Sequence, residues 1–280
     1  RALYSNADGD NNTAVGYRAL YTLDPSGNAD MHNVAVGYDT GLNMSTGTQN
    51  VLVGALAGDA LTTGYRNTVL GHNALGAETT GAGSIAIGYH ALRFQNTESY
   101  NYNIAIGTEA GQAITTGTEN TLIGGLAGDA LTTGGRNVAI GLGALGTEDT
   151  TGRVVAIGYA ALGSQNAAAD TYNVAIGYEA GNDISTGTLN TIVGGLAGDA
   201  LTTGIANTLF GYNAGGAITG ADGITAFGKD ACELNTSGIN TAFGSNALAA
   251  VTSGTYNTAV GSDALTAATG SYNTAVGGLA

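Results

Sequence analysis

The sequence predicts an all-β fold: a parallel β-solenoid (a β-roll or β-helix) of about 16 rungs that forms one repeat domain over residues 1–280. One short phrase, Asn-Thr-Ala-Val-Gly, opens at Asn12–Gly16 and recurs in close copies as far as Asn273–Gly277. The copies follow one another at a nearly constant spacing, as from Gly37 to Gly54 and on to Gly71, and such repeats bury their apolar faces by stacking on their neighbours. The 48 glycines and single proline suit a chain that turns sharply many times.

The copies align on a closing glycine, from which the positions of each repeat are counted below. The closing glycines are Gly16, Gly37, Gly54, Gly71, Gly88, Gly107, Gly124, Gly141, Gly158, Gly177, Gly194, Gly211, Gly228, Gly244, Gly261 and Gly277.

The residues just before each closing glycine predict a short, β-branched strand. Position −1 is always large and apolar, position −2 is usually Ala, and position −3 is Thr, Val or Ile. Strands with two apolar faces belong to parallel sheets that are covered on both sides. We expect position −1 to form the buried inner ladder, which includes Val15, Val36, Val53, Leu70 and Ile87. The outward stripe would then include Ala14, Leu52, Leu122 and Ile192.

One coil can cover only one of these faces, and the sequence predicts no helix to cover the other. An exposed apolar stripe of this length exceeds what monomers tolerate. We therefore expect a further copy of the same chain to cover it.

Position −4 predicts a polar corner in each coil. It is Asn in every copy except three, where Ser84, Val154 and Ile224 stand at equal intervals of four copies. Stacked asparagines can hydrogen-bond backbone groups at a tight corner. Ala-Leu pairs after the glycine and Thr-Gly or Ser-Gly pairs further on mark the remaining corners.

The sequence also has a second, longer period that spans four coils. Gly125–Gly134 is repeated at Gly195–Gly204, with a near copy at Ala55–Gly64. Once per four-coil block the connection is longer, but the fourth block, near Asn235, lacks the extension. The longer loops are Asp24–His32, Gln95–Tyr102 and Gln165–Tyr172. Loops on a rigid scaffold are where binding residues usually lie.

Composition excludes several classes of partner. A net charge of −14 repels phosphate, so nucleic acid and anionic membranes are poor partners. The sequence contains no run of eighteen apolar residues, so it predicts no membrane-spanning helix. Cys232, the single cysteine, is expected to be a small buried side chain. The chain begins and ends inside a repeat, so we expect it to be a segment of a longer array.

The Asn-x-Ala-Val/Ile-Gly phrase with its trailing Ala-Leu resembles the head repeat of YadA-type trimeric autotransporter adhesins. It is still more similar to the longer arrays of phage tail fibres, which often precede a self-cleaving chaperone domain. The resemblance covers essentially the whole chain. It implies an elongated homotrimer of parallel β-rolls, located outside a cell or on a virion. The length of the repeat favours the phage fibre, because the adhesin repeat is typically shorter.

The resulting hypothesis is a structural fibre, a tail-fibre shaft or head that presents loops for attachment to a glycan or protein of the host surface. The alternatives are an adhesin head or a self-assembling extracellular filament on a bacterial surface. An ice-binding solenoid is disfavoured, because threonines at position −3 alternate with residues such as Val34, Ile85 and Ile104, so no continuous Thr face is evident.

Candidate binding residues follow from the long loops. The receptor-binding candidates are Tyr100, Tyr102, Tyr172, His32 and Asp170. Tyrosines that directly follow the closing glycine form a second candidate column, because their rings are large and keep a polar tip. The members of this column are Tyr17, Tyr38, Tyr89, Tyr159, Tyr178 and Tyr212. Packing between rungs or subunits would explain that column equally well.

Metal, cofactor and catalytic signals are weak. Asp59, Asp129 and Asp199 share one register and could hold calcium in a trimer, although solvated turn aspartates would look the same. His72 and His90 lie on successive rungs, but two imidazoles make a poor zinc site. Gly141–Gly146 matches the dinucleotide fingerprint without its βαβ context. No catalytic constellation stands out, so we expect neither an enzyme nor a cofactor.

Overall fold

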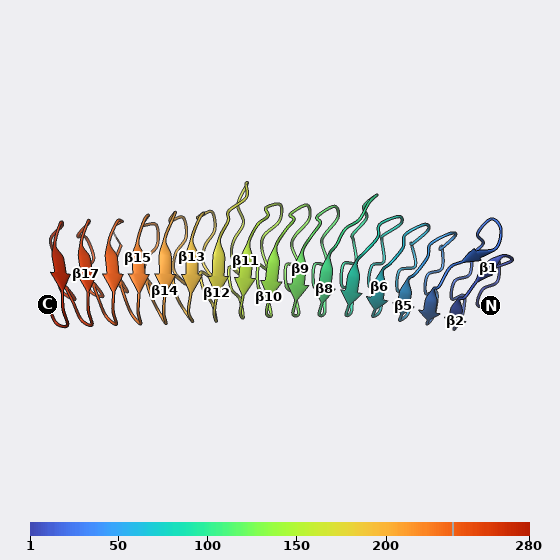
Figure 1. Cartoon of the computed structure of the whole chain (residues 1–280), viewed down its shortest axis with the longest axis horizontal. Coiled ribbons are helices and arrows are strands. Elements are labelled where there is room, and N and C mark those ends of the chain that lie inside the picture. The colour runs from blue at the N-terminus through green and yellow to red at the C-terminus, as the bar shows by residue number, and fades with distance from the viewer. Residues whose placement is uncertain (237) are drawn as a thin grey trace. The chain divides into compact units, whose positions relative to one another are not determined.

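The computed structural model, which describes residues 1–236 and 238–280, is an all-β parallel solenoid of about 16 turns (Figure 1). Its described residues form no helix. The predicted fold class is therefore confirmed. The chain divides into two compact units, Arg1–Asn137 and Val138–Ala280, which are described separately and called the N-terminal and the C-terminal unit.

The N-terminal unit holds β1 (Gly9–Asp10), β2 (Thr13–Val15), β3 (Ala29–Asp30), β4 (Val34–Val36), β5 (Val51–Val53), β6 (Thr68–Leu70), β7 (Ile85–Ile87), β8 (Ile104–Ile106) and β9 (Thr121–Ile123). The C-terminal unit holds β10 (Val138–Ile140), β11 (Val155–Ile157), β12 (Val174–Ile176), β13 (Thr191–Val193), β14 (Thr208–Phe210), β15 (Thr225–Phe227), β16 (Thr241–Phe243), β17 (Thr258–Val260) and β18 (Thr274–Val276).

Within each unit, the strand of every repeat pairs in parallel with the strand of the next, and equivalent positions lie opposite each other. Ala35 of β4 opposes Leu52 of β5, and Ala226 of β15 opposes Ala242 of β16. The short strands β1 and β3 form a separate parallel pair beside the first coils. The repeat register predicted from the closing glycines is therefore the register of the sheet.

The prediction of which strand positions face into the coil was wrong: position −2 faces inward and position −1 faces outward. Position −2 points into the coil, where the side chains of Leu52, Leu122 and Ile192 are fully buried and Ala14 is half-buried. Position −1 points outward, with Val15 57% and Leu70 47% exposed. Val36, Val53 and Ile87 are half-buried. The narrow coil interior favours Ala at position −2, and a larger side chain such as Leu52 fits where Gly41 and Gly58 leave space beside it.

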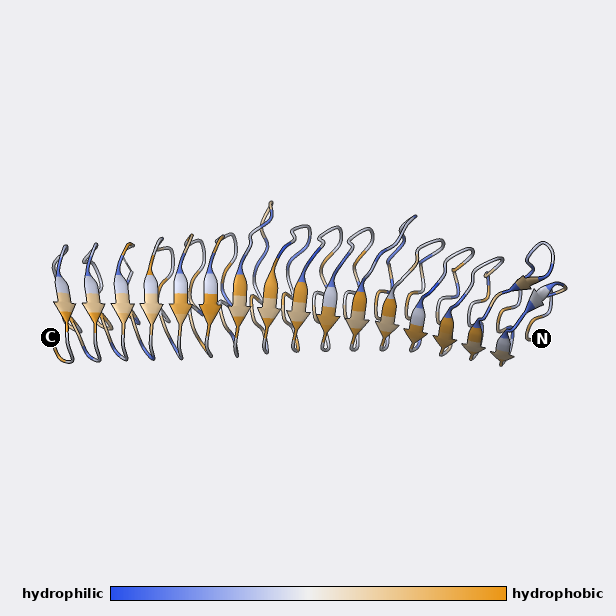
Figure 2. Ribbon diagram, viewed as in Figure 1, coloured by the Kyte–Doolittle hydropathy of each residue, from blue (hydrophilic) through white to orange (hydrophobic). Residues whose placement is uncertain are grey.

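Many strands are coloured as hydrophobic in Figure 2, and both the inward position −2 and the outward position −1 carry apolar residues. The threonine rank at position −3 is interrupted in the N-terminal unit, as predicted. In the C-terminal unit it runs unbroken from β13 to β18, as Thr191, Thr208, Thr225, Thr241, Thr258 and Thr274. The outward rank beside it consists of Val and Phe, so this face is not a threonine surface.

The closing glycines are required because consecutive turns touch there. Gly107 has a φ of 145°, and a Cβ on it would lie 2.3 Å from the carbonyl oxygen of Gly124. No side chain can occupy that space without separating the two turns. The close approach of backbone to backbone is thus fixed by glycine at each repeat.

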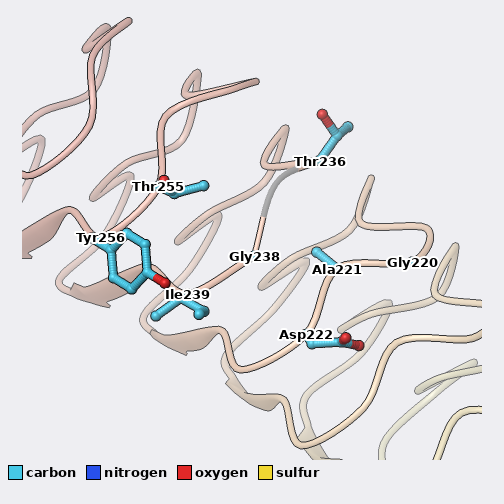
Figure 3. Close-up of a pocket in the computed structure, with 8 residues that line it drawn as sticks. All are labelled: Gly220, Ala221, Asp222, Thr236, Gly238, Ile239, Thr255 and Tyr256. Carbon is cyan, nitrogen blue, oxygen red and sulfur yellow. The ribbon is translucent and has the colours of Figure 1, made fainter.

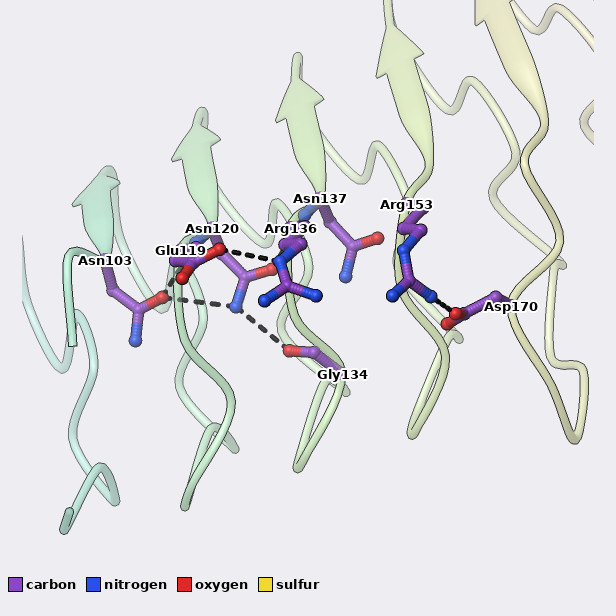
Figure 4. A network of polar contacts seen from close by, with 8 residues as sticks. All are labelled: Asn103, Glu119, Asn120, Gly134, Arg136, Asn137, Arg153 and Asp170. Atoms are coloured by element: carbon purple, nitrogen blue, oxygen red, sulfur yellow. Dashed lines mark hydrogen bonds and ion pairs between the residues drawn. The ribbon is translucent and has the colours of Figure 1, made fainter.

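The asparagine corner is confirmed as a buried column. Asn120 donates from Nδ2 to the carbonyl oxygen of Gly134 at 3.0 Å, and its backbone N–H donates to Oδ1 of Asn103 at 2.9 Å (Figure 4). Its own Oδ1 accepts the backbone N–H of Asn137 at 3.0 Å. Each side chain thereby ties its own turn to the neighbouring turns.

Candidate binding surfaces

The long loops stand out from the minimal coil. The loop over residues 24–32 contains β3, and the loop over 95–102 forms a parallel bridge between Tyr100 and Ala82 of the preceding turn. Long loops rise above the turns beside them (Figure 1). The extended connections are therefore anchored by backbone pairing at some points, while side chains such as Tyr100 and Tyr102 remain exposed.

Tyr100 and Tyr102, two of the predicted binding residues, form one aromatic cluster. Their rings stack with centroids 5.2 Å apart and an interplanar angle of 4°. Tyr65 packs edge-on against Tyr100 at 5.4 Å, and the hydrogen bond with Tyr100 raises the pKa of Tyr65. Nη1 of Arg66 donates to the Tyr100 hydroxyl at 3.4 Å. Sequence reasoning missed Tyr65 and Arg66, which lie two turns earlier.

Gly83 explains how residues two turns apart can meet. It occupies the intervening turn at a φ of 77°, and a Cβ there would lie 3.5 Å from Cδ1 of Tyr100 and 3.6 Å from Cδ1 of Tyr102. A Cβ alone would fit at these distances, but a larger side chain would press against both rings, so the small residue leaves Tyr100 room to reach Tyr65. The signal in the sequence was the register, because Arg66, Gly83 and Tyr102 all occupy position −5 and Tyr65 directly precedes Arg66.

Tyr172 and Asp170 belong to the C-terminal unit and are engaged differently. Asp170 pairs with Arg153 (Figure 4) and also accepts the backbone N–H of Gly152 at 3.1 Å. The Arg153 guanidinium lies 5.6 Å from the centroid of the Tyr172 ring. This loop therefore presents a neutralised ion pair beside a single exposed tyrosine.

His32 is exposed at the end of the first long loop, with a φ of 53°. It is not part of the tyrosine cluster. Asp59 and Asp129 each lie half-buried in a separate turn of the N-terminal unit, and Asp199 has the same setting in the C-terminal unit. Burial raises the pKa of all three carboxyl groups. Within one chain, Asp59 and Asp129 are four turns apart and do not share a site.

Four of the six tyrosines that follow the closing glycines form exposed stacked pairs with each other, and Tyr89 stacks on His72 instead. Tyr17 stacks on Tyr38 at 5.4 Å, and Tyr159 stacks on Tyr178 at 5.3 Å. The His72 and His90 rings approach to 5.9 Å, as the sequence suggested. In the residues that the structure describes, no three His, Cys, Asp or Glu side chains are grouped to hold a metal ion.

Two buried glutamates were missed by sequence reasoning. Glu78 is fully buried, and its carboxylate accepts the backbone N–H groups of Thr79, Gly81 and Thr97 together with the side-chain amide of Gln95. Glu148 is also fully buried. It accepts the backbone N–H groups of Asp149 and Thr151 and the amide of Gln165. Both lie just before the breaks in the asparagine column at Ser84 and Val154. Glu at position +7, recurring after one four-coil period, was the available signal.

A pocket of about 370 Å³ opens in the C-terminal unit (Figure 3). It lies where the four-coil period would place a further long loop. The lining residues are Gly220, Ala221, Asp222, Thr236, Gly238, Ile239, Thr255 and Tyr256. Asp222 is already engaged, because its Oδ1 accepts the backbone N–H of Ile205 at 2.7 Å.

Cys232 is fully buried, as predicted, and burial raises the pKa of its thiol to about 12. Because this thiol stays protonated, it is a poor nucleophile.

No helix among the described residues is long and apolar enough to cross a membrane. The chain matches no family model, no curated protein and no solved structure.

Proposed function

We propose that this chain is a segment of a homotrimeric extracellular fibre, a phage tail-fibre shaft or head that presents loops for attachment to a host surface. The apolar outer strand face is the observation that carries the proposal. Three-fold assembly follows the resemblance of the repeat to YadA-type heads and phage fibre arrays.

The outer face is too apolar to be left in water. In the N-terminal unit Val15, Val51 and Leu70 are each more than two fifths exposed. In the C-terminal unit Phe210, Phe227 and Phe243 stack along one rank at 4.5 and 5.6 Å and are 42 to 44% exposed. Ranks of this kind lie on consecutive parallel strands, which makes the apolar surface continuous within each unit. Surfaces like this mark protein–protein contacts.

The assembly is tested by placing charge on this face. The triple variant Val53→Glu, Leu70→Glu and Ile87→Glu should convert a trimer into monomers, because each carboxylate would be desolvated in the interface. Light scattering after size exclusion measures the mass, and circular dichroism checks that the coil is retained. Thr133→Glu, on an exposed turn, is the control and should remain trimeric. A wild-type monomer at micromolar concentration would contradict the proposal.

The attachment role is tested on the long loops. Trimming residues 24–32, 95–102 and 165–172 to the length of the minimal coil should reduce attachment of the intact fibre to its host cells by at least tenfold. Three loops on each of three chains would supply repeated weak sites, whose combined avidity exceeds that of one site. Undiminished attachment would mean that this segment acts only as a spacer.

A further inference from the structure

We propose that Tyr65, Arg66, Tyr100 and Tyr102 form a binding site for a glycan whose terminal sugar carries one carboxylate. We call these four residues the tyrosine–arginine cluster. The inference deepens the proposed function by naming the class of ligand, and it rests on that function only for the biological use of the site. Sugar binding itself can be measured on the chain alone.

The three tyrosine rings of the cluster form an angled aromatic surface. Tyr100 and Tyr102 lie almost parallel, while Tyr65 stands at 79° to Tyr100. The rings of Tyr100 and Tyr102 are 38% and 57% exposed. Tyrosine combines a flat apolar ring with a polar hydroxyl, which suits the apolar CH face and the hydroxyl rim of a pyranose. Two planes meeting at a steep angle can contact two sides of one sugar.

Arg66 brings a positive charge to the cluster. Its Nε donates to the neutral Oε1 of Gln49 at 2.9 Å, and its Nη1 donates to the Tyr100 hydroxyl. Among the residues that the structure describes, no carboxylate pairs with this guanidinium. By contrast, Arg18 pairs with Asp39. The planar guanidinium is suited to a carboxylate, with which it forms strong charge-assisted hydrogen bonds.

The equivalent turns one four-coil period further on lack this combination of residues. The positions of Gln49, Tyr65 and Arg66 are occupied there by Glu119, Gly135 and Arg136. Nε of Arg136 donates to Oε2 of Glu119 at 2.7 Å, so that charge is compensated, and the Gly135 position supplies no ring. The same scaffold therefore occurs once with an open cation beside three tyrosines. It occurs once with a paired cation and only Tyr172 of the three rings, because Asp170 stands at the position of Tyr100.

The overall charge limits the ligand further. A net charge of −14 disfavours polyanions such as nucleic acid or a polysaccharide with an acid on every unit. A single carboxylate on an otherwise neutral glycan pairs with Arg66 while adding little repulsion from the rest of the chain. The tyrosine rings then hold the neutral part of the sugar.

Methyl glucuronide and methyl glucoside, which differ in one carboxylate, are the probes. Saturation-transfer NMR on the intact chain should show glucuronide binding in the millimolar range, about tenfold tighter than glucoside, as one charge-assisted hydrogen bond provides. Gln49→Glu supplies Arg66 with the carboxylate that Arg136 already has, and should abolish the preference. Tyr100→Ala combined with Tyr102→Ala should remove binding of both sugars.

Glu119→Gln is the matched control, since it frees Arg136 where Gly135 and Asp170 replace two of the three tyrosines, and it should create no second site. Circular dichroism verifies that each variant is folded. Equal binding of both sugars, no binding of either, or an unchanged preference in Gln49→Glu would overturn the proposal. If the wild-type chain is a trimer but binds neither sugar, only the proposed sugar site is refuted. If it is a monomer that still prefers glucuronide, only the proposed trimeric fibre is refuted.

Discussion

The buried asparagine and the closing glycine of each repeat determine how closely two consecutive turns can approach. The closing glycines let backbone touch backbone, while the buried asparagines supply the hydrogen bonds that the turned backbone cannot make for itself. Both roles could be predicted from residue type and repetition. The direction of the strand side chains could not, because Val15 and Ala14 are both apolar and only the width of the coil decides which points inward.

The asparagine column should be a major source of stability. Asn120→Ala removes the donor to Gly134 and the acceptor for the N–H of Asn137, and leaves both backbone groups buried. The expected cost is about 1–3 kcal/mol in the free energy of unfolding. Urea denaturation measures it, with Thr133→Ala on the same turn as a control near zero. Unchanged stability would mean that water replaces the amide.

At the scale of the single turn, two interior positions share one volume. Where position +4 is Gly, position +7 is a large buried apolar side chain, as in Gly58 with Leu61. Where position +4 is Leu, position +7 can be polar, as in Leu145 with Glu148. The polar version places a carboxylate where the asparagine column is interrupted. The alternation between Gly with a large apolar residue and Leu with a polar residue at positions +4 and +7 is visible in the sequence. It could be interpreted only once both positions were known to face inward.

Exchanging the two positions gives a test of this shared volume. A Cβ on Gly128 would lie 2.8 Å from Cδ1 of Leu131, so Gly128→Leu alone should be destabilising through overpacking, by about 1–3 kcal/mol. Leu131→Ala alone should cost about 2–5 kcal/mol through the cavity that it leaves. The double variant should cost less than the sum, because the new leucine fills that cavity. Strict additivity in urea denaturation would show that the two positions are independent.

At the scale of the whole chain, repetition made the fold class and the strand register predictable, while the binding surface depended on departures from repetition. Tyr100 and Tyr102 were identifiable because they lie in a long loop. Arg66 was not, because its role depends on Gly83 having no side chain and on residue 49 being Gln rather than Glu. Such pairings across turns appear only when the coil is assembled.

Three half-buried aspartates make the stability of the folded chain depend on pH. Burial raises the pKa of Asp59, Asp129 and Asp199 in the folded protein above the ordinary value of 3.8. The folded state then binds protons more tightly than the unfolded chain, so these groups lower stability as pH rises through the window above 3.8. Replacing all three by Asn should raise the melting temperature at pH 7, and the gain should vanish as pH falls below that window.

The same variant separates a solvated turn aspartate from a calcium ligand. If the carboxylates of a trimer held calcium, millimolar calcium would raise the melting temperature of the wild type, and the Asn variant would be the less stable protein in its presence. Thermal melts between pH 3 and pH 8, with and without calcium, distinguish the two by the sign of the change. We expect the Asn variant to be the more stable at pH 7 under both conditions, because desolvation, the first cause of the raised pKa values, acts on each carboxylate singly.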